Sequence, residues 1–183
     1  SNKPQGVVLS NPGGPGDSGV DFVYNTSLDF VEKLGLEDFD IVGFDPRGVG
    51  SSGGLSCLTD QQNDKFIYLD YTPDDEGEQS LYDEWMEIDE PCAEKFGKAL
   101  RFYSTENTAR DMDLIRESMG FEQINYLGIS YGTYLGGVYA TLFPDRVEAM
   151  FLDSAFDPQG DTAEQNYLTQ AEGFEKAFNN WVE

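Results

Sequence analysis

The sequence predicts an α/β fold built around a doubly wound, mainly parallel sheet. Short apolar runs of strand length alternate with segments of helical periodicity, as in sheets whose strands are joined by helical crossovers. Two glycine-rich turns directly follow such runs, as ligand-facing loops do at the carboxyl ends of parallel strands. Hydrophobic residues make up 39% of the 183 positions, enough for a sizeable core, and the length favours one domain.

Four apolar runs are the predicted strands. Each has the length and composition of a buried strand, and helical segments separate most of them. In chain order they are Val7–Leu9, Phe39–Asp45, Ile124–Ile129 and Val147–Leu152.

Helices are predicted on both sides of the third strand. The helix before it runs from about Glu106 to Met119 and ends at Gly120, with Met112, Ile115 and Met119 facing inward. The helix after it runs from Thr133 to Phe143 and ends before Pro144. Its small residues allow close packing on the sheet, and they are Gly136, Gly137 and Ala140.

A last helix is predicted over residues 161–183. Its apolar side consists of Tyr167, Leu168, Ala171, Phe174, Phe178 and Trp181.

An acidic excursion from Phe66 to Glu94 contains no lysine or arginine. A calcium site is conceivable there, but the spacing fails the EF-hand pattern, which favours a solvated acidic face. The other face is apolar at helical intervals, and Pro91 divides the segment into two helical pieces. The apolar positions are Leu81, Trp85, Ile88, Cys92 and Phe96.

The charge balance restricts the partners. Eleven basic against 35 acidic residues give a net charge of −24, which argues against nucleic acid or anionic membranes. Nothing before Val7 resembles a signal peptide or a membrane span, and we expect no cofactor and no metal.

The run Gly128-Ile129-Ser130-Tyr131-Gly132 joins the third strand to the following helix. Its two glycines let the backbone fold sharply, so that Ser130 is held in a strained conformation with its hydroxyl raised above the sheet edge. This is the G-x-S-x-G pattern of a nucleophile elbow. Taken alone, it also fits an ordinary strand-turn-helix junction.

The turn after the first strand, residues 10–19, is dominated by glycine and proline. A flexible loop is one interpretation, although flexible linkers are rarely so rich in proline. A rigid turn at this place could aim a backbone N–H at a developing oxyanion, as acyl transfer requires.

The second glycine-rich turn, residues 46–53, superficially suggests a phosphate loop. It lacks the Gly-Lys-Ser/Thr ending of a P-loop and does not clearly open a helix with Gly-x-Gly-x-x-Gly, so nucleotide binding is disfavoured. We interpret Asp45 and Arg47 as a buried structural pair that fixes this turn.

Cys57 and Cys92 are the only cysteines and have no metal-type spacing. They fit a disulfide formed in an oxidising compartment; the alternative is two unrelated buried thiols. Closing a loop of roughly 35 residues would stabilise the fold by about 4 kcal/mol in the chain-entropy model.

Four motifs, in order, resemble the α/β-hydrolase family and, more narrowly, its secreted tripeptidyl aminopeptidase and proline iminopeptidase branch. They are Pro-Gly-Gly-Pro-Gly at 12–16, Asp-Pro-Arg-Gly-Val-Gly-Ser-Ser at 45–52, the elbow, and Leu152-Asp153. The resemblance covers residues 6 to about 158. Pro12 stands where the iminopeptidase motif begins with histidine, which favours the tripeptidyl type.

The resemblance also implies roles for individual residues. Ser130 would be the nucleophile, and the backbone N–H groups of Tyr131 and of Gly14, or its neighbour Gly13, would form the oxyanion hole. Asp153 lies too early for the triad aspartate of the family and is interpreted as structural. The protein would be secreted or exposed at the cell surface.

The chain contains no histidine, although a serine nucleophile of this kind needs a nearby base. In the family the acid and the histidine follow the serine, so we expect this to be the N-terminal part of a longer hydrolase. Residues 1–160 would be core and 161–183 the start of the lid, with the later strands and most of the lid missing.

Three functions remain open. The first is a serine exopeptidase acting on peptides near free N-termini, the second an esterase or other α/β hydrolase, and the third a non-catalytic binding protein on the same fold. By itself the chain is expected to be inactive. It is also expected to self-associate or to bind the complementary C-terminal part of the same protein, because the strand 147–152 would be an unpaired edge.

Overall fold

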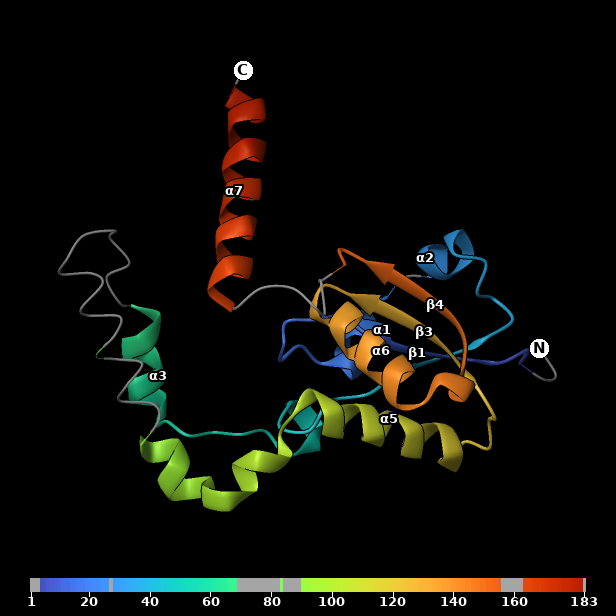
Figure 1. Ribbon diagram of the computed structural model, residues 1–183, viewed down its shortest axis with the longest axis horizontal. Coiled ribbons are helices and arrows are strands. Elements are labelled where there is room, and N and C mark those ends of the chain that lie inside the picture. The colour runs from blue at the N-terminus through green and yellow to red at the C-terminus, as the bar shows by residue number, and fades with distance from the viewer. Residues whose placement is uncertain (1–3, 27, 69–82, 84–89, 156–162, 183) are drawn as a thin grey trace.

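A four-stranded parallel sheet forms the centre of the molecule (Figure 1). The computed structural model describes residues 4–26, 28–68, 83, 90–155 and 163–182. The strands are β1 (Val7–Asn11), β2 (Asp40–Gly43), β3 (Ile124–Ile129) and β4 (Val147–Asp153). All four predicted strands are therefore confirmed, with β3 at its predicted bounds.

The strand order β2-β1-β3-β4 determines which turns can meet. From β1 the chain moves outward to β2 on one side and later returns to β3 on the other, so the order reverses between β1 and β3. In the parallel register Asn11 lies opposite Gly128. The turns that follow β1 and β3 thus leave the sheet side by side, at the kind of switch point where open α/β sheets bind ligands.

Two helices cover one face of the sheet, α5 (Thr105–Ser118) and α6 (Tyr131–Leu142) (Figure 1). The Ser104 hydroxyl caps α5 by accepting the N–H of Asn107, which satisfies one of the free donors of the first turn. The core between these helices and the sheet includes Val7, Leu9, Ile124, Tyr126, Ala109, Met112, Leu135 and Tyr139.

Two details of these helices differ from the sequence expectation. Met112 is fully buried and Ile115 packs against the core, but Met119 is 36% exposed because α5 ends before it and Gly120 turns the chain away at φ 80°. Gly136 does lie against the Tyr126 ring, whereas Gly137 faces open space and allows no closer packing.

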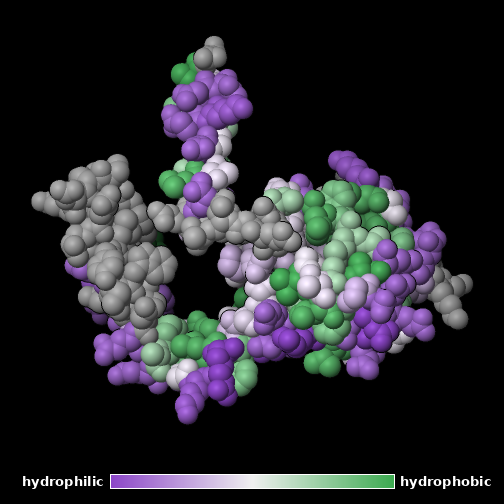
Figure 2. Space-filling view, in the orientation of Figure 1, coloured by the Kyte–Doolittle hydropathy of each residue, from purple (hydrophilic) through white to green (hydrophobic). Residues whose placement is uncertain are grey.

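Within the described residues, less structure covers the other face of the sheet. Helix α1 (Gly19–Asn25) packs on β2, and α2 (Leu28–Lys33) precedes Leu34 and Leu36, which border an apolar hollow with Val8 and Leu127. On β4, which is the edge strand of this sheet, Phe151 is 54% exposed. Figure 2 shows hydrophobic surface in the region of β4 and α6.

The described part of the segment between β2 and α5 contains several short helices. They are η1 (Gly50–Ser52), α3 (Asp60–Ile67), a helical stretch over residues 90–96, and η2 (Gly97–Phe102), while η3 (Pro144–Arg146) precedes β4. Cys57 and Cys92 form a disulfide with their Cα atoms 4.7 Å apart, so the predicted pairing is confirmed. The predicted apolar positions Leu81, Trp85 and Ile88 lie outside the described residues.

The last helix, α7 (Ala163–Val182), stands away from the sheet (Figure 1). The side chains of its predicted apolar side are exposed, with Trp181 at 82% and Tyr167 at 72%. No described helix combines the length and the apolar character needed to cross a bilayer.

The interpretation of Asp45 and Arg47 as a pair is wrong. Arg47 instead forms a two-pronged ion pair with Asp111 of α5, through N–O distances of 2.6 and 2.8 Å. Asp45 accepts hydrogen bonds from the Ser18 hydroxyl at 2.6 Å and from backbone N–H groups on both sides of it in the chain. The two side chains therefore link this turn to different elements, Arg47 to α5 and Asp45 to Ser18 at the start of α1.

Candidate active site

Ser130 lies at the junction of β3 and α6 in a strained backbone conformation. Its φ of 54° and ψ of −123° are unfavourable for a residue with a Cβ. Hydrogen bonds on both sides hold it there, since its N–H donates to the Asp153 carbonyl at 3.0 Å and its carbonyl accepts the Thr133 N–H at 2.8 Å. The residue itself is exposed, so its hydroxyl is open to a substrate.

The elbow is sharp because its two glycines touch. A Cβ added to Gly128 would lie 2.6 Å from the Gly132 carbonyl oxygen, which leaves no room for a side chain. The Tyr126 hydroxyl donates a hydrogen bond to the same Gly132 carbonyl at 2.8 Å. Burial raises the pKa of Tyr126, so this hydroxyl keeps its proton and remains a donor.

The turn after β1 brings Gly13 against the elbow. A Cβ added to Gly13 would lie 3.0 Å from the Ser130 Cβ and 3.2 Å from the Tyr131 nitrogen, at a φ of 107° that favours glycine. A side chain at Gly13 would therefore occupy the space in front of the Tyr131 N–H. Gly14 continues the same turn, and a Cβ added to it would meet backbone atoms of Gly16 and Asp17.

Among the backbone N–H groups without an acceptor in the described part of the chain, two flank Ser130 in the turn after β1 and in the elbow. One is the N–H of Tyr131, the first residue of α6. The N–H groups in the first turn of a helix have no acceptor within that helix. The other is that of Gly14, an exposed residue. The N–H of Gly13, by contrast, donates to the Asn11 side-chain oxygen at 3.1 Å. Together with the positive end of the α6 dipole, the two unpaired donors can stabilise a negatively charged oxygen beside Ser130.

The side chain of Tyr131 is fixed by α5. Its hydroxyl lies 2.8 Å from the Thr105 hydroxyl at the start of that helix. Burial raises the pKa of Tyr131, and the hydrogen bond to Thr105 acts in the opposite direction. The first turn of α5 thereby holds Tyr131, the residue that directly follows Ser130.

Asp45 ties the turn after β1 to the turn after β2. The Ser18 hydroxyl donates a hydrogen bond to Asp45 and accepts one from the Asp21 N–H. The second bond caps α1, so Ser18 marks the end of the turn after β1. The Ser18 hydrogen bond, assisted by the Ser51 and Val20 N–H groups, holds the pKa of Asp45 below its usual value.

Sequence reasoning identified Ser130, Tyr131, Gly13 and Gly14, and the structure brings Gly13, Ser130 and Tyr131 into contact. It missed Asn11, Tyr126 and Thr105. For Asn11 the Asn-Pro-Gly sequence was an available turn signal. Nothing in the sequence marks Tyr126 or Thr105, because their contacts to the elbow depend on the packing of the sheet and of α5.

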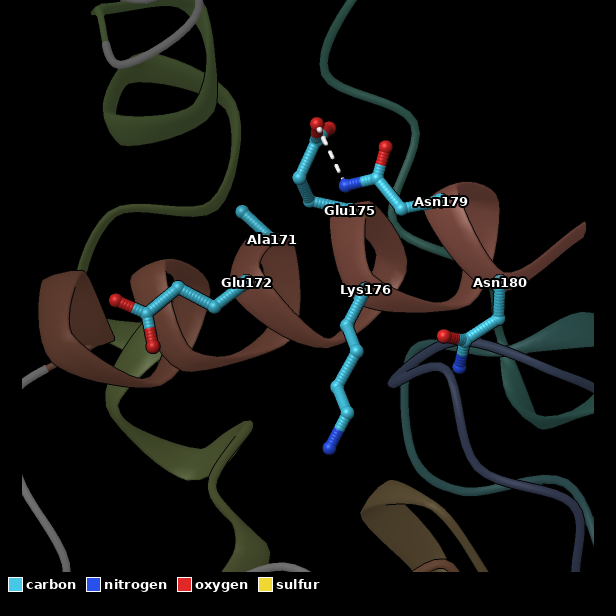
Figure 3. Close-up of a pocket in the computed structure, with 6 residues that line it drawn as sticks. All are labelled: Ala171, Glu172, Glu175, Lys176, Asn179 and Asn180. Atoms are coloured by element: carbon cyan, nitrogen blue, oxygen red, sulfur yellow. Dashed lines mark hydrogen bonds between the residues drawn. The ribbon is translucent and has the colours of Figure 1, made fainter. Parts of the chain in front are cut away.

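The chain contains no histidine, the residue that most often serves as the base for a serine nucleophile. Within the described residues, no group of three or more potential ligands is placed to hold a metal ion. A hollow on α7 offers no second site, because residues of one helix line it and Glu172, Lys176 and Asn180 point in different directions (Figure 3). The contact drawn there joins Asn179 to Glu175 at 3.3 Å.

Comparison with known proteins identifies relatives of the whole chain. Residues 6–183 match the family model described as alpha/beta hydrolase fold. The chain is 43% identical to a protein named tripeptidyl aminopeptidase from Streptomyces coelicolor, over 97% of this chain and 33% of that protein. In Mycobacterium tuberculosis it is 42% identical to serine protease Hip1 and 41% identical to carboxylesterase B, each over 97% of this chain and 34% of the relative.

A solved structure, titled marine microorganism esterase, has a TM-score of 0.51 and 16% identity, and the match covers 92% of this chain and 46% of that one. At this identity the likeness concerns the fold alone. The chain spans about a third of the length of the curated relatives that it matches.

Proposed function

This chain belongs to the α/β-hydrolase family, and from that premise we propose that its protein is a serine exopeptidase of the tripeptidyl aminopeptidase type. The enzyme would remove short peptides from free N-termini through an acyl-enzyme on Ser130. The observation that carries the proposal is the strained, exposed serine beside two unpaired backbone N–H groups. The relatives named aminopeptidase and serine protease, at 43% and 42% identity, support the peptide as substrate.

The proposed chemistry is acyl transfer. The Ser130 Oγ attacks the carbonyl carbon of the scissile bond while its proton passes to a base, and the carbonyl oxygen becomes an oxyanion facing the N–H groups of Tyr131 and Gly14. Collapse of this intermediate breaks the C–N bond, and the proton moves to the departing amine. Water then hydrolyses the ester on Ser130.

The base and its partner acid are proposed to come from residues outside this chain. This follows from the count of zero histidines together with the length of the relatives, of which the chain covers 33–34%. In the same arrangement α7 would begin the lid that sets substrate specificity. Its exposed apolar side chains support that role, since a lid helix needs an apolar side to cover a site.

A secreted or cell-surface location is part of the proposal. The disulfide between Cys57 and Cys92 supports it, because such bonds persist in oxidising compartments. Intact mass before and after reduction should differ by two hydrogens, and the protein should be found outside the cytoplasm on cell fractionation. Two thiols that alkylate freely without reduction would contradict this location.

An esterase is the second candidate function. It is favoured by the 41% identity to carboxylesterase B, and an elbow with an oxyanion turn serves any acyl transfer. Rates with a tripeptidyl-coumarin and a nitrophenyl ester would separate the two candidates. A much higher kcat/KM for the ester would favour the esterase.

The central test is the replacement Ser130→Ala in the full-length protein. We expect it to abolish labelling by a fluorophosphonate and to lower kcat by several powers of ten, because only binding and oxyanion effects survive. The matched control is Ser118→Ala, which replaces an exposed serine at the end of α5. It should leave both the labelling and kcat unchanged. Labelling that persists in Ser130→Ala would reject the nucleophile, and a wild-type protein that is never labelled would favour a non-catalytic binding protein.

A further inference from the structure

Asn11, the last residue of β1, lies directly behind the site. It is fully buried, and its side-chain oxygen accepts the Gly13 N–H at 3.1 Å. We propose that Asn11 is a positioning residue that fixes the turn after β1 so that the Gly14 N–H, and not that of Gly13, faces the oxyanion. The inference rests on the proposed acyl transfer at Ser130.

The hydrogen bond closes a tight local ring. An Asn oxygen that accepts the N–H two residues later forms an Asx-turn, which replaces a backbone turn at the start of a loop. Pro12, which stands inside the ring, has a fixed φ and no N–H of its own. The direction of the chain at Gly13 is therefore set by the Asn11 side chain.

The same side chain also touches the elbow. A Cβ added to Gly132 would lie 3.0 Å from the Asn11 Oδ1, so the amide packs directly against that glycine. Asn11 is thus in contact with both turns of the site, Gly13 on one side and Gly132 on the other. Its position controls the separation of the two unpaired donors, the N–H groups of Gly14 and Tyr131.

The side-chain nitrogen of Asn11 indicates that this residue is not present for stability alone. Its Nδ2 is the only buried side-chain nitrogen or oxygen without a hydrogen-bond partner in the part of the chain that the structure describes. A buried donor without a partner costs free energy that an apolar side chain of similar size avoids. The fold would accept leucine there, whereas the turn requires an acceptor.

The Asn11 acceptor occupies the Gly13 N–H. Once this group is bound to Asn11, it cannot also donate to a substrate. The oxyanion hole then consists of two defined donors that need no rearrangement during the reaction, which is the condition for a large electrostatic effect on the rate.

The test compares Asn11→Leu with Asn11→Ser in the full-length protein. Leucine removes the acceptor but keeps the volume, and serine offers a weaker acceptor for the same turn. Loss of one oxyanion donor lowers kcat by about 100- to 1000-fold, so we expect Asn11→Leu, which displaces the donor, to lower kcat roughly 10- to 100-fold. KM should stay within about twofold. The melting temperature should change little, because leucine removes the unpaired Nδ2 but leaves the Gly13 N–H without its acceptor. Asn11→Ser should recover part of the rate.

Hydrogen exchange supplies a readout that does not need activity. In Asn11→Leu the amides of residues 10–16 should exchange faster than in the wild type, with the rest of the sheet unchanged and Asn11→Ser intermediate. Unchanged exchange in this segment would overturn the inference even if the enzyme is inactive, and so would a kcat within twofold of wild type. A wild-type protein without acyl-transfer activity would reject the proposed function instead.

Discussion

The turns after β1 and β2 look alike in sequence and differ in what they contact. Both are rich in glycine and begin with proline, and both leave the carboxyl end of a parallel strand. The turn after β1, residues 12–18, lies against Ser130 and Tyr131. The turn after β2, residues 46–53, is held by other contacts, which run through Arg47 to α5 and through Asp45 to Ser18.

Strand order explains the difference. The strand β1 pairs with β3, which carries the nucleophile, whereas β2 pairs with β1 alone. A turn after β1 is therefore adjacent to the elbow, and a turn after β2 is one strand further away. Glycine content indicates that a turn is tight or approaches other backbone closely, but the sheet topology decides whether that turn belongs to the site.

The largest loss of kcat is expected from a substitution that disrupts the turn after β1. Gly13→Ala adds a Cβ at a φ of 107°, 2.6 Å from the Ile129 carbonyl and in front of the Tyr131 N–H. Because this variant both displaces the turn and blocks a donor, we expect kcat of the full-length protein to fall by about 100- to 1000-fold, as for loss of an oxyanion donor.

The matched control is Gly53→Ala in the second turn. Gly53 also has a positive φ, 75°, but nothing lies within 4 Å of an added Cβ. This variant should lose about 1 kcal/mol of stability from backbone strain and keep its kcat. Equal losses of kcat in the two variants would mean that the two turns serve the site alike, against the structure.

The elements that carry the two turns could be predicted from the sequence. The periodicity and the glycine pattern predicted four strands, the elbow and both turns, because local composition determines such elements. The partner of Arg47 could not be predicted, since Asp111 lies 64 positions away and is brought close by packing of α5. The same holds for the contact of Thr105 with Tyr131, which joins two helices.

A smaller effect is expected from Asp45→Asn, which weakens the link between the two turns. Asp45 is 8% exposed and accepts hydrogen bonds from Ser18, Val20 and Ser51. Loss of its charge should lower the free energy of unfolding at pH 7 by about 1–3 kcal/mol, measured by urea denaturation. The Gly13 contacts do not include Asp45, so kcat should fall far less than in Gly13→Ala.

The pH dependence of this variant follows from the lowered pKa of Asp45. A carboxyl with a depressed pKa in the folded state stabilises the fold above its unfolded pKa, near 3.8, and loses that contribution as the pH falls through the folded pKa. The difference between wild type and Asp45→Asn should therefore shrink below about pH 4. The exposed Asp38→Asn serves as the control. A difference that stays constant between pH 7 and pH 3 would reject the role of the charge.

The smallest effect is expected from the ion pair that holds the second turn. Arg47 and Asp111 are about one-third exposed, at 29% and 32%, and exposed pairs are weakened by water and salt. A double-mutant cycle with Arg47→Met and Asp111→Asn should give a coupling of about 1 kcal/mol or less, smaller at high salt. The bond from Arg47 to the Phe102 carbonyl, at 2.7 Å, lies outside this coupling and adds to the effect of the arginine variant alone. Since neither side chain contacts the elbow in the described structure, kcat should stay within twofold of wild type. A tenfold loss in Arg47→Met, with the melting temperature unchanged, would place the second turn in the catalytic machinery after all.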